Sequence, residues 1–170
     1  MNPTKRSVTV CAPINIALIK YWGKRAGDMI LPLNDSISVN VDALCAKSTV
    51  EACYGEGLSD SVSLNGKERP VDPQTRYYSF FARLRAILQS RDPSMDVTKW
   101  HFHVTSETNF PVSAGLASSA AGFSAMAFGI GQLFEFDNQT MSDLARVGRF
   151  ILLLFHPFSF RLDYNNKDLV

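Results

Sequence analysis

Two adjacent serines begin a long apolar segment in the stretch NFPVSAGLASSAAGFSAMAFGIGQLF, residues 109–134. The N-terminus of a helix has several unpaired backbone N–H groups and a partial positive charge, so it attracts anions. Small residues let an anion approach that backbone closely. The hydroxyls of Ser118 and Ser119 can donate to phosphate oxygens or bind Mg²⁺. One interpretation of this stretch is therefore phosphate binding.

Close packing of a helix start against a sheet is the other interpretation of the same stretch. Alanine, glycine and serine also serve that purpose, with Ser113 as an ordinary helix cap. The stretch matches neither GxxxxGK[ST] nor GxGxxG. Taken alone, it favours packing over phosphate binding.

A second stretch, CAPINIALIKYWGKR at residues 11–25, brings polar and basic residues together around a strand and a loop. Lysines act as point charges that suit phosphate oxygens. The alternative is a solvated basic loop with Trp22 in the core. The residues that carry the functional interpretation are Asn15, Lys20, Tyr21, Lys24 and Arg25.

His101 and His103 are two residues apart on an expected strand, so they share one face of it. They form either a metal-binding pair or an ordinary surface pair. No third ligand follows at a suitable spacing, which favours the surface interpretation.

With LPLNDSISVNVD at residues 31–42, these stretches resemble the diphosphomevalonate (mevalonate diphosphate) decarboxylase family of the GHMP kinase superfamily. The superfamily's phosphate-loop pattern is matched by Pro111, then three residues, Gly115-Leu116, one residue and Ser118-Ser119-Ala120. The string NIALIKYWGK is typical of the decarboxylases within the superfamily. The three motifs occur in the family's order, and the resemblance covers roughly residues 5–148.

The resemblance implies ATP-dependent decarboxylation of (R)-5-diphosphomevalonate to isopentenyl diphosphate, CO₂, ADP and phosphate, a step of isoprenoid and sterol biosynthesis. Mg²⁺, lysines and oriented N–H groups suit a reaction that brings two polyphosphates together. By resemblance, Lys20 lies near the substrate and the transferring phosphoryl group as the candidate catalytic residue. Asn15 and Tyr21 line the substrate site, and Lys24 contacts the substrate diphosphate.

The resemblance also implies an ATP-phosphate loop, with Mg²⁺ held through ATP and by Ser118 or Ser119. The loop residues are Ser113, Ala114, Gly115, Leu116, Ala117, Ser118 and Ser119. Ser36 and Ser38 lie in the second motif and are at least as well explained as outward residues of a strand.

The resemblance ends near Gly148. The family continues with a glycine- and serine-rich run whose arginine is expected to grip the substrate carboxylate, and its catalytic aspartate lies in a later DAGPN-like segment. These 170 residues contain neither, and no aspartate here is assigned that role. We expect an incomplete GHMP-type N-terminal domain at residues 1–148 and a divergent tail at 149–170. We also expect the chain as written to be a truncated, inactive form.

Two alternatives stay open for the function. One is a GHMP small-molecule kinase. The other is a non-catalytic isoform that pairs with a full-length enzyme, because the family is commonly homodimeric.

The composition is that of a soluble globular protein, with 46% hydrophobic residues and a net charge of +1. That charge gives no general attraction to nucleic acid or to an anionic membrane. Three cysteines without a CxxC indicate reduced thiols. We see no signal peptide or transmembrane run, so we expect a cytosolic protein with a small-molecule substrate.

The elements that must position these residues follow from periodicity. Helical spacing and capping residues predict helices at 73–89 with Asp72 as the cap, at 115–134, and at 137–149 with Asn138 or Thr140 near the cap. Alternation and turn residues predict strands at 7–11 (ended by Pro13), 36–41, 48–54, 62–64 before the Asn65-Gly66 turn, and 100–106.

The first of these helices has one apolar stripe, formed by Tyr77, Phe80, Phe81, Leu84, Ile87 and Leu88. The expected buried face of the second is formed by Phe123, Met126, Ala127, Ile130 and Leu133. Arg76, Arg83 and Arg85 lie off the stripe and are interpreted as a solvated face. The order of the elements predicts an α+β domain with a mixed or antiparallel sheet. The resemblance implies a ribosomal-protein-like two-layer sandwich without the family's C-terminal GHMP domain.

Overall fold

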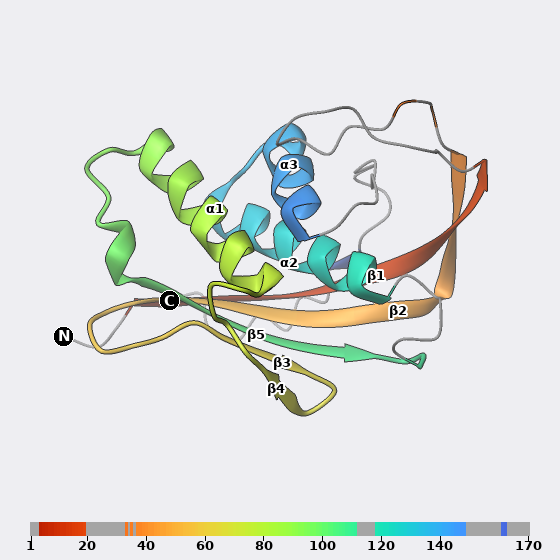
Figure 1. Ribbon diagram of the computed structural model, residues 1–170, viewed down its shortest axis with the longest axis horizontal. Coiled ribbons are helices and arrows are strands. Elements are labelled where there is room, and N and C mark those ends of the chain that lie inside the picture. The colour runs from red at the N-terminus through yellow and green to blue at the C-terminus, as the bar shows by residue number, and fades with distance from the viewer. Residues whose placement is uncertain are drawn as a thin grey trace.

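The computed structural model describes residues 4–19, 33, 35, 37–111, 118–148 and 161–162. Within them, one mixed sheet has the strand order β4-β3-β5-β2-β1-β6, and the helices lie together on one of its faces (Figure 1). The strands are β1 (Thr4–Ile19), β2 (Ile37–Tyr54), β3 (Ser61–Leu64), β4 (Lys67–Arg69), β5 (Trp100–Thr108) and β6 (Arg161–Leu162). The helices are α1 (Arg76–Arg91), the 3₁₀ helix η1 (Val97–Lys99), α2 (Ser118–Phe134) and α3 (Asn138–Gly148). The two-layer α+β architecture is confirmed.

The sheet combines antiparallel and parallel pairs. β1 pairs with β2, and β2 with β5, both antiparallel, whereas β3 runs parallel to β5. α2 packs over β1 and β2, and α1 and α3 complete the helical layer. The main core lies between the layers and includes Val10, Val50, Phe80, Phe102 and Ile130.

The prediction that Pro13 ends the first strand is wrong, because β1 continues to Ile19. Proline is tolerated in a sheet at an edge or a bulge, where its missing N–H breaks no ladder. Both conditions hold at Pro13. Among the described residues, β6 pairs with Val10 and Cys11 alone, and the β1–β2 register shifts between Pro13 and Ile14.

The two strands predicted at 36–41 and 48–54 are parts of the single strand β2. Pro13 faces Cys45 while Ile14 faces Val41, so three residues of β2 bulge out between these pairs. Sequence alternation is interrupted at such a bulge, which is why one strand was predicted as two.

The predicted hairpin is confirmed at Asn65-Gly66, between β3 and β4. Both turn residues have positive φ, 50° and 73°. This is the backbone of a two-residue type I′ turn, for which Asn-Gly is the favoured pair.

The apolar stripe of α1 faces the core as predicted, with Phe80, Phe81, Leu84 and Leu88 buried. The cap is Thr75, not Asp72. The Thr75 hydroxyl accepts from the backbone N–H of Tyr78, while Asp72 accepts from Gln74 one turn earlier. An Asx turn at Asp72 therefore precedes the helix start.

Arg85 is not on a solvated face, which corrects a second prediction for α1. Its guanidinium binds both carboxylate oxygens of Asp60 at 2.8 and 2.9 Å and donates to the Trp100 carbonyl at 2.8 Å. Arg76 and Arg83 are exposed, as predicted. Arg85 differs because β5 and the segment before β3 pass beneath its side of the helix, which no helical period reveals.

α2 is the most deeply buried helix, and its predicted inner face is confirmed at Phe123, Met126, Ala127 and Ile130, while Leu133 is only partly buried. At Gly129 the helix approaches the sheet closely, since a β-carbon there would lie 2.8 Å from Cγ2 of Val50. A larger residue at this position would push α2 away from β2.

α3 follows at Asn138, but its cap is Asp137, not Asn138 or Thr140. An oxygen of the Asp137 carboxylate accepts from the backbone N–H of Thr140 at 2.7 Å. The bonds from Thr140 hold the pKa of this carboxyl below its usual range. Asp is among the strongest N-cap residues, and it lies here one position earlier than we expected.

Two residues of the tail join the sheet, which the sequence did not predict. Arg161 and Leu162 form β6, antiparallel to Cys11 and Val10. In the part of the chain that the structure describes, no helix combines the length and the apolar character needed to cross a membrane.

Candidate functional site

The start of α2 presents the positive end of a 17-residue helix. No acidic residue lies in its first turn, so no side chain of the helix neutralises that end. The backbone of Ser118 and Ser119 forms the first two helical residues. Their side chains, and all of Ser113, Ala114, Gly115, Leu116 and Ala117, lie outside the described residues.

A second small core cluster anchors this helix start to the sheet. Ala121 of α2 packs there with Ile14 of β1, Ala46 of β2 and Phe110, the residue before Pro111. Residues from the stretch 11–25 and from the phosphate-loop stretch are thus in one cluster, although about a hundred positions of the sequence separate them. Sequence order alone does not show this contact.

Asn109 joins the stem of the phosphate-loop motif to β2. Its side-chain carbonyl accepts from the N–H of Cys45 at 2.9 Å, and its side-chain NH₂ donates to the Ala43 carbonyl at 2.8 Å. Its own N–H donates to the Cys45 carbonyl at 3.3 Å. These bonds satisfy backbone groups of Ala43 and Cys45 at the bulge of β2. Sequence analysis did not assign Asn109 a role, although it begins the quoted motif.

Asn15 is the predicted substrate residue that the structure places. It is half-buried on β1, opposite Asn40 of β2 and next to Ile14 of the anchoring cluster. Side chains alternate along a strand, so Asn15 and Ile14 point to opposite faces of the sheet. Lys20, Tyr21, Lys24 and Ser36 lie outside the described residues.

The structure also places two other sequence candidates. Ser38 is an exposed residue of β2, in agreement with its interpretation as an outward strand residue. His103 bonds through Nδ1 to the Ser61 hydroxyl at 2.8 Å. Among the described residues, no group of three His, Cys, Asp or Glu side chains could hold a metal ion.

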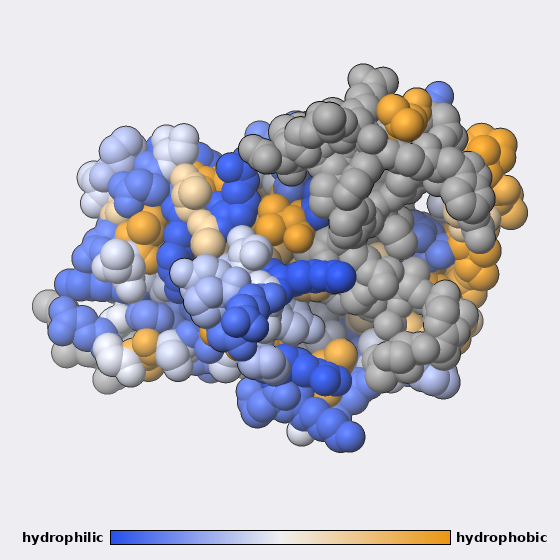
Figure 2. Space-filling view, in the orientation of Figure 1, coloured by the Kyte–Doolittle hydropathy of each residue, from blue (hydrophilic) through white to orange (hydrophobic). Residues whose placement is uncertain are grey.

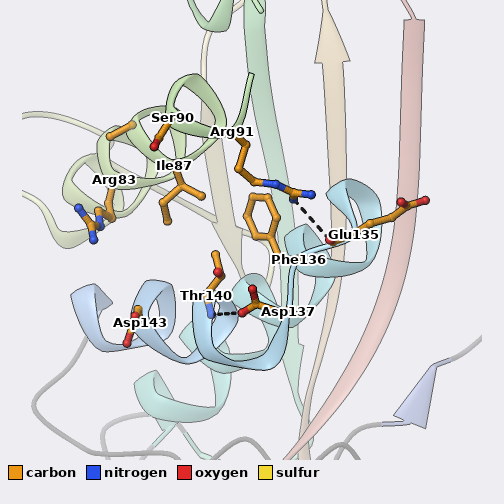
Figure 3. Close-up of a pocket in the computed structure, with 10 residues that line it drawn as sticks. Arg83, Ile87, Ser90, Arg91, Glu135, Phe136, Asp137, Thr140 and Asp143 are labelled. Atoms are coloured by element: carbon orange, nitrogen blue, oxygen red, sulfur yellow. Dashed lines mark hydrogen bonds between the residues drawn. The ribbon is translucent and has the colours of Figure 1, made fainter. Parts of the chain in front are cut away.

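A surface pocket of about 470 Å³ lies elsewhere, between α1 and the turn that joins α2 to α3 (Figure 3). Several of its charged groups already have partners. Arg91 donates to the Phe134 carbonyl at 2.8 Å and stacks over Phe136, and Asp143 pairs with Arg146. None of the residues predicted to bind ATP or substrate lines it.

Comparison with known proteins identifies the family. Residues 12–149 match the model of the diphosphomevalonate decarboxylase-like N-terminal domain. The chain belongs to the diphosphomevalonate decarboxylase-like family. The diphosphomevalonate decarboxylase of Danio rerio is 43% identical over 147 residues, which are 83% of this chain and 36% of that protein.

Solved structures of the family share the fold. The mevalonate diphosphate decarboxylase from Trypanosoma brucei matches with a TM-score of 0.67 and 38% identity, over 84% of this chain and 37% of that one. A solved complex of MDDEF with MVAPP, AMPPCP and magnesium matches with a TM-score of 0.65 and 33% identity, over 85% and 42%. The chain therefore spans about two fifths of the length of the relatives it matches, and that portion is their N-terminal domain.

Proposed function

We propose that this chain carries the ATP-phosphate site and part of the substrate site for the ATP-dependent decarboxylation of 5-diphosphomevalonate to isopentenyl diphosphate. The start of α2 carries the proposal: it is a helix end without acidic residues, and the cluster of Ala121 and Ile14 anchors it to β1. Family membership supports the same reaction.

The described residues fit a polyphosphate. Backbone N–H groups at a helix start donate to phosphate oxygens, and the helix dipole favours the negative charge. The residue after the two serines, Ala120, is small and buried, so no large side chain at this position obstructs the start of the helix. The relative that is solved with AMPPCP and magnesium supports MgATP as the ligand.

Each residue has a distinct part in this proposal. Residues 113–119 hold the ATP phosphates, and Ser118 or Ser119 reaches the magnesium ion. Asn15 and Tyr21 orient the substrate, Lys24 binds its diphosphate, and Lys20 stabilises the charge of the phosphoryl group in transfer. ATP supplies the phosphoryl group that turns the 3-hydroxyl into a leaving group.

We further propose that these 170 residues bind MgATP but do not release CO₂ by themselves. They contain no counterpart of the carboxylate-gripping arginine or the DAGPN-type aspartate that the family resemblance implies. Loss of an essential base or of an orienting contact lowers a rate by orders of magnitude. We also propose that the chain is cytosolic and that it pairs with a second chain of the family.

Two measurements on the purified chain test this proposal. Titration with MgATP by calorimetry should show binding that the Ser118→Ala/Ser119→Ala variant weakens about tenfold, the loss expected for one or two charge-assisted hydrogen bonds. The matched control, Ser90→Ala on the exposed side of α1, should bind as the parent does.

Release of CO₂ from carboxyl-labelled 5-diphosphomevalonate with MgATP is the second measurement. We expect none above background. Release would show that the missing groups are replaced from within these residues. A folded chain that fails to bind MgATP would contradict the ATP-site assignment.

A further inference from the structure

Cys11 and Cys45 lie across the pairing of β1 with β2, with their sulfur atoms 3.7 Å apart. Their neighbours Ala12 and Ala46 face each other directly in the register. Both side chains are half-buried, so a small reagent can reach them. Their separation of 34 positions in the sequence hides this proximity.

We propose that Cys11 and Cys45 form a reversible disulfide, a modification site distinct from the residues proposed to bind ATP and substrate. The sulfur atoms must approach to about 2.05 Å, which is a movement of under about 2 Å. The bulge of β2, residues 42–44, lies directly before Cys45 in the sequence.

The chemistry needs an oxidant of the small-molecule disulfide class, such as oxidised glutathione. The thiolate of one cysteine attacks a glutathione sulfur, the glutathione S–S bond breaks, and one glutathione thiolate leaves. The second protein thiolate attacks the resulting mixed disulfide and releases the second glutathione. The protein loses two hydrogens in total, and the oxidised glutathione becomes two thiols.

Cys53 is an internal contrast to this pair. It is buried on β2, where burial raises the pKa of its thiol and so disfavours the reactive thiolate. It faces Lys5 and His101 in the register, with no cysteine opposite. An oxidant should therefore distinguish it from the other two.

The position of the bridge gives it a structural consequence. Residues 14–19 of β1 and 37–41 of β2 form what we call the β1–β2 arm, which continues past the helices (Figure 1). Cys11 and Cys45 lie at the base of this arm, beside the register shift that separates the arm from the rest of the sheet. A disulfide there ties together the two strands that carry Asn15 away from the sheet.

Mass spectrometry of the intact 170-residue chain under oxidised glutathione tests the proposal. We expect the loss of two hydrogens, one linked peptide pair containing Cys11 and Cys45, and full reversal by dithiothreitol. Glutathione adducts on both cysteines without a link, no reaction at either, or links that involve Cys53 or a second chain would each overturn it.

Single serine variants complete the design. Cys11→Ser and Cys45→Ser should each keep one stable glutathione adduct on the remaining partner. The matched control, Cys53→Ser, should form the linked pair at the parent rate. The peptide map of the unsubstituted chain decides the question even where a variant folds poorly.

Discussion

Asn109 shows how one side chain can hold a binding segment in place without contacting a ligand. Its amide satisfies backbone groups of Ala43 and Cys45 at the bulge, and the chain then continues through the buried Phe110 toward the phosphate-loop motif. Thr108 is held in turn by the side chain of Asn65. The stem of the candidate loop is thus fixed on both sides.

Replacing Asn109 with alanine should destabilise the domain by about 1–2 kcal/mol, because it removes two hydrogen bonds to backbone groups at the bulge, which water replaces only in part. Urea unfolding followed by circular dichroism measures the change. Gln74→Ala, the removal of an exposed loop amide, is the control and should stay within about 0.5 kcal/mol of the parent. Equal effects of the two substitutions would show that the bulge does not depend on Asn109.

Arg85 and Asp60 form a largely buried ion pair, with side chains 25% and 12% exposed. Asp60 also accepts from the Phe102 N–H at 3.0 Å, so its charge is tied to β5. Arg85→Ala should cost about 3–5 kcal/mol, because it leaves this carboxylate buried and uncompensated.

The control for Arg85 is on the same helix. Arg83 is exposed and makes no ion pair within the described residues, so Arg83→Ala should change the free energy of unfolding by less than about 0.5 kcal/mol. A loss under about 1 kcal/mol for Arg85→Ala would indicate that water solvates Asp60 once the guanidinium is removed.

Helix α2 approaches the sheet closely at Gly129. Gly129→Ala places a methyl group 2.8 Å from Val50 Cγ2 and 3.4 Å from Val8 Cγ1, so we expect a loss of about 1–3 kcal/mol from overpacking. Gly122→Ala on the same helix meets nothing within 4 Å and should stabilise by up to about 1 kcal/mol through helix propensity. Thermal unfolding of the two variants should shift in opposite directions. Shifts in the same direction would refute the close approach.

The start of α3 should respond to acid. The pKa of Asp137 is lowered in the folded protein by its bonds from Thr140, so its stabilising effect is complete above the unfolded value near 3.8 and is lost as pH falls below it. The parent should therefore lose stability between about pH 4 and 2 more steeply than Asp137→Asn, which keeps an acceptor without the charge. Unfolding midpoints of the two proteins are measured at several pH values. If the midpoints of both fall in parallel with pH, the Asp137 charge does not cause the loss of stability in acid.

Elements that depend on a local pattern of side chains were predicted well from the sequence. The stripe of α1, the inner face of α2 and the Asn65-Gly66 turn each follow from local spacing or backbone preference. The failures depend on neighbours distant in the sequence. Pro13 lies inside β1 because an edge and a bulge accommodate it, and Arg85 is only partly exposed because it pairs with Asp60.

The same distinction applies to the candidate site. Its motifs were recognisable in the sequence, but the contact of Ile14 with Ala121 depends on the fold. The role of Asn109 became visible only with the bulge of β2, whose residues carry no signal of their own. Lys20, Tyr21 and Lys24 remain predictions, since they lie outside the described residues.

At the scale of the whole molecule, the apolar face of the sheet extends beyond the helices that cover it, along the β1–β2 arm. Ile14 and Val41 face the helices, and the next pairs on that face, Ile16 with Val39 and Ile19 with Ile37, are exposed at 51–56%. Figure 2 shows orange surface at the end of the molecule where this arm lies. Contiguous apolar surface of this kind promotes association.

Threonine substitutions on the arm test this property without removing strand preference. Ile37→Thr/Val39→Thr should lower the fluorescence of an apolar-surface dye and the concentration-dependent association seen by sedimentation, while the unfolding free energy changes by less than about 1 kcal/mol because both side chains are already half exposed. Leu58→Thr, at an exposed position outside the arm, is the control and should leave both readouts unchanged. If the arm variant and the control behave alike, the dye and the association report some other surface. If only the arm variant loses both signals, the apolar face of the β1–β2 arm causes them.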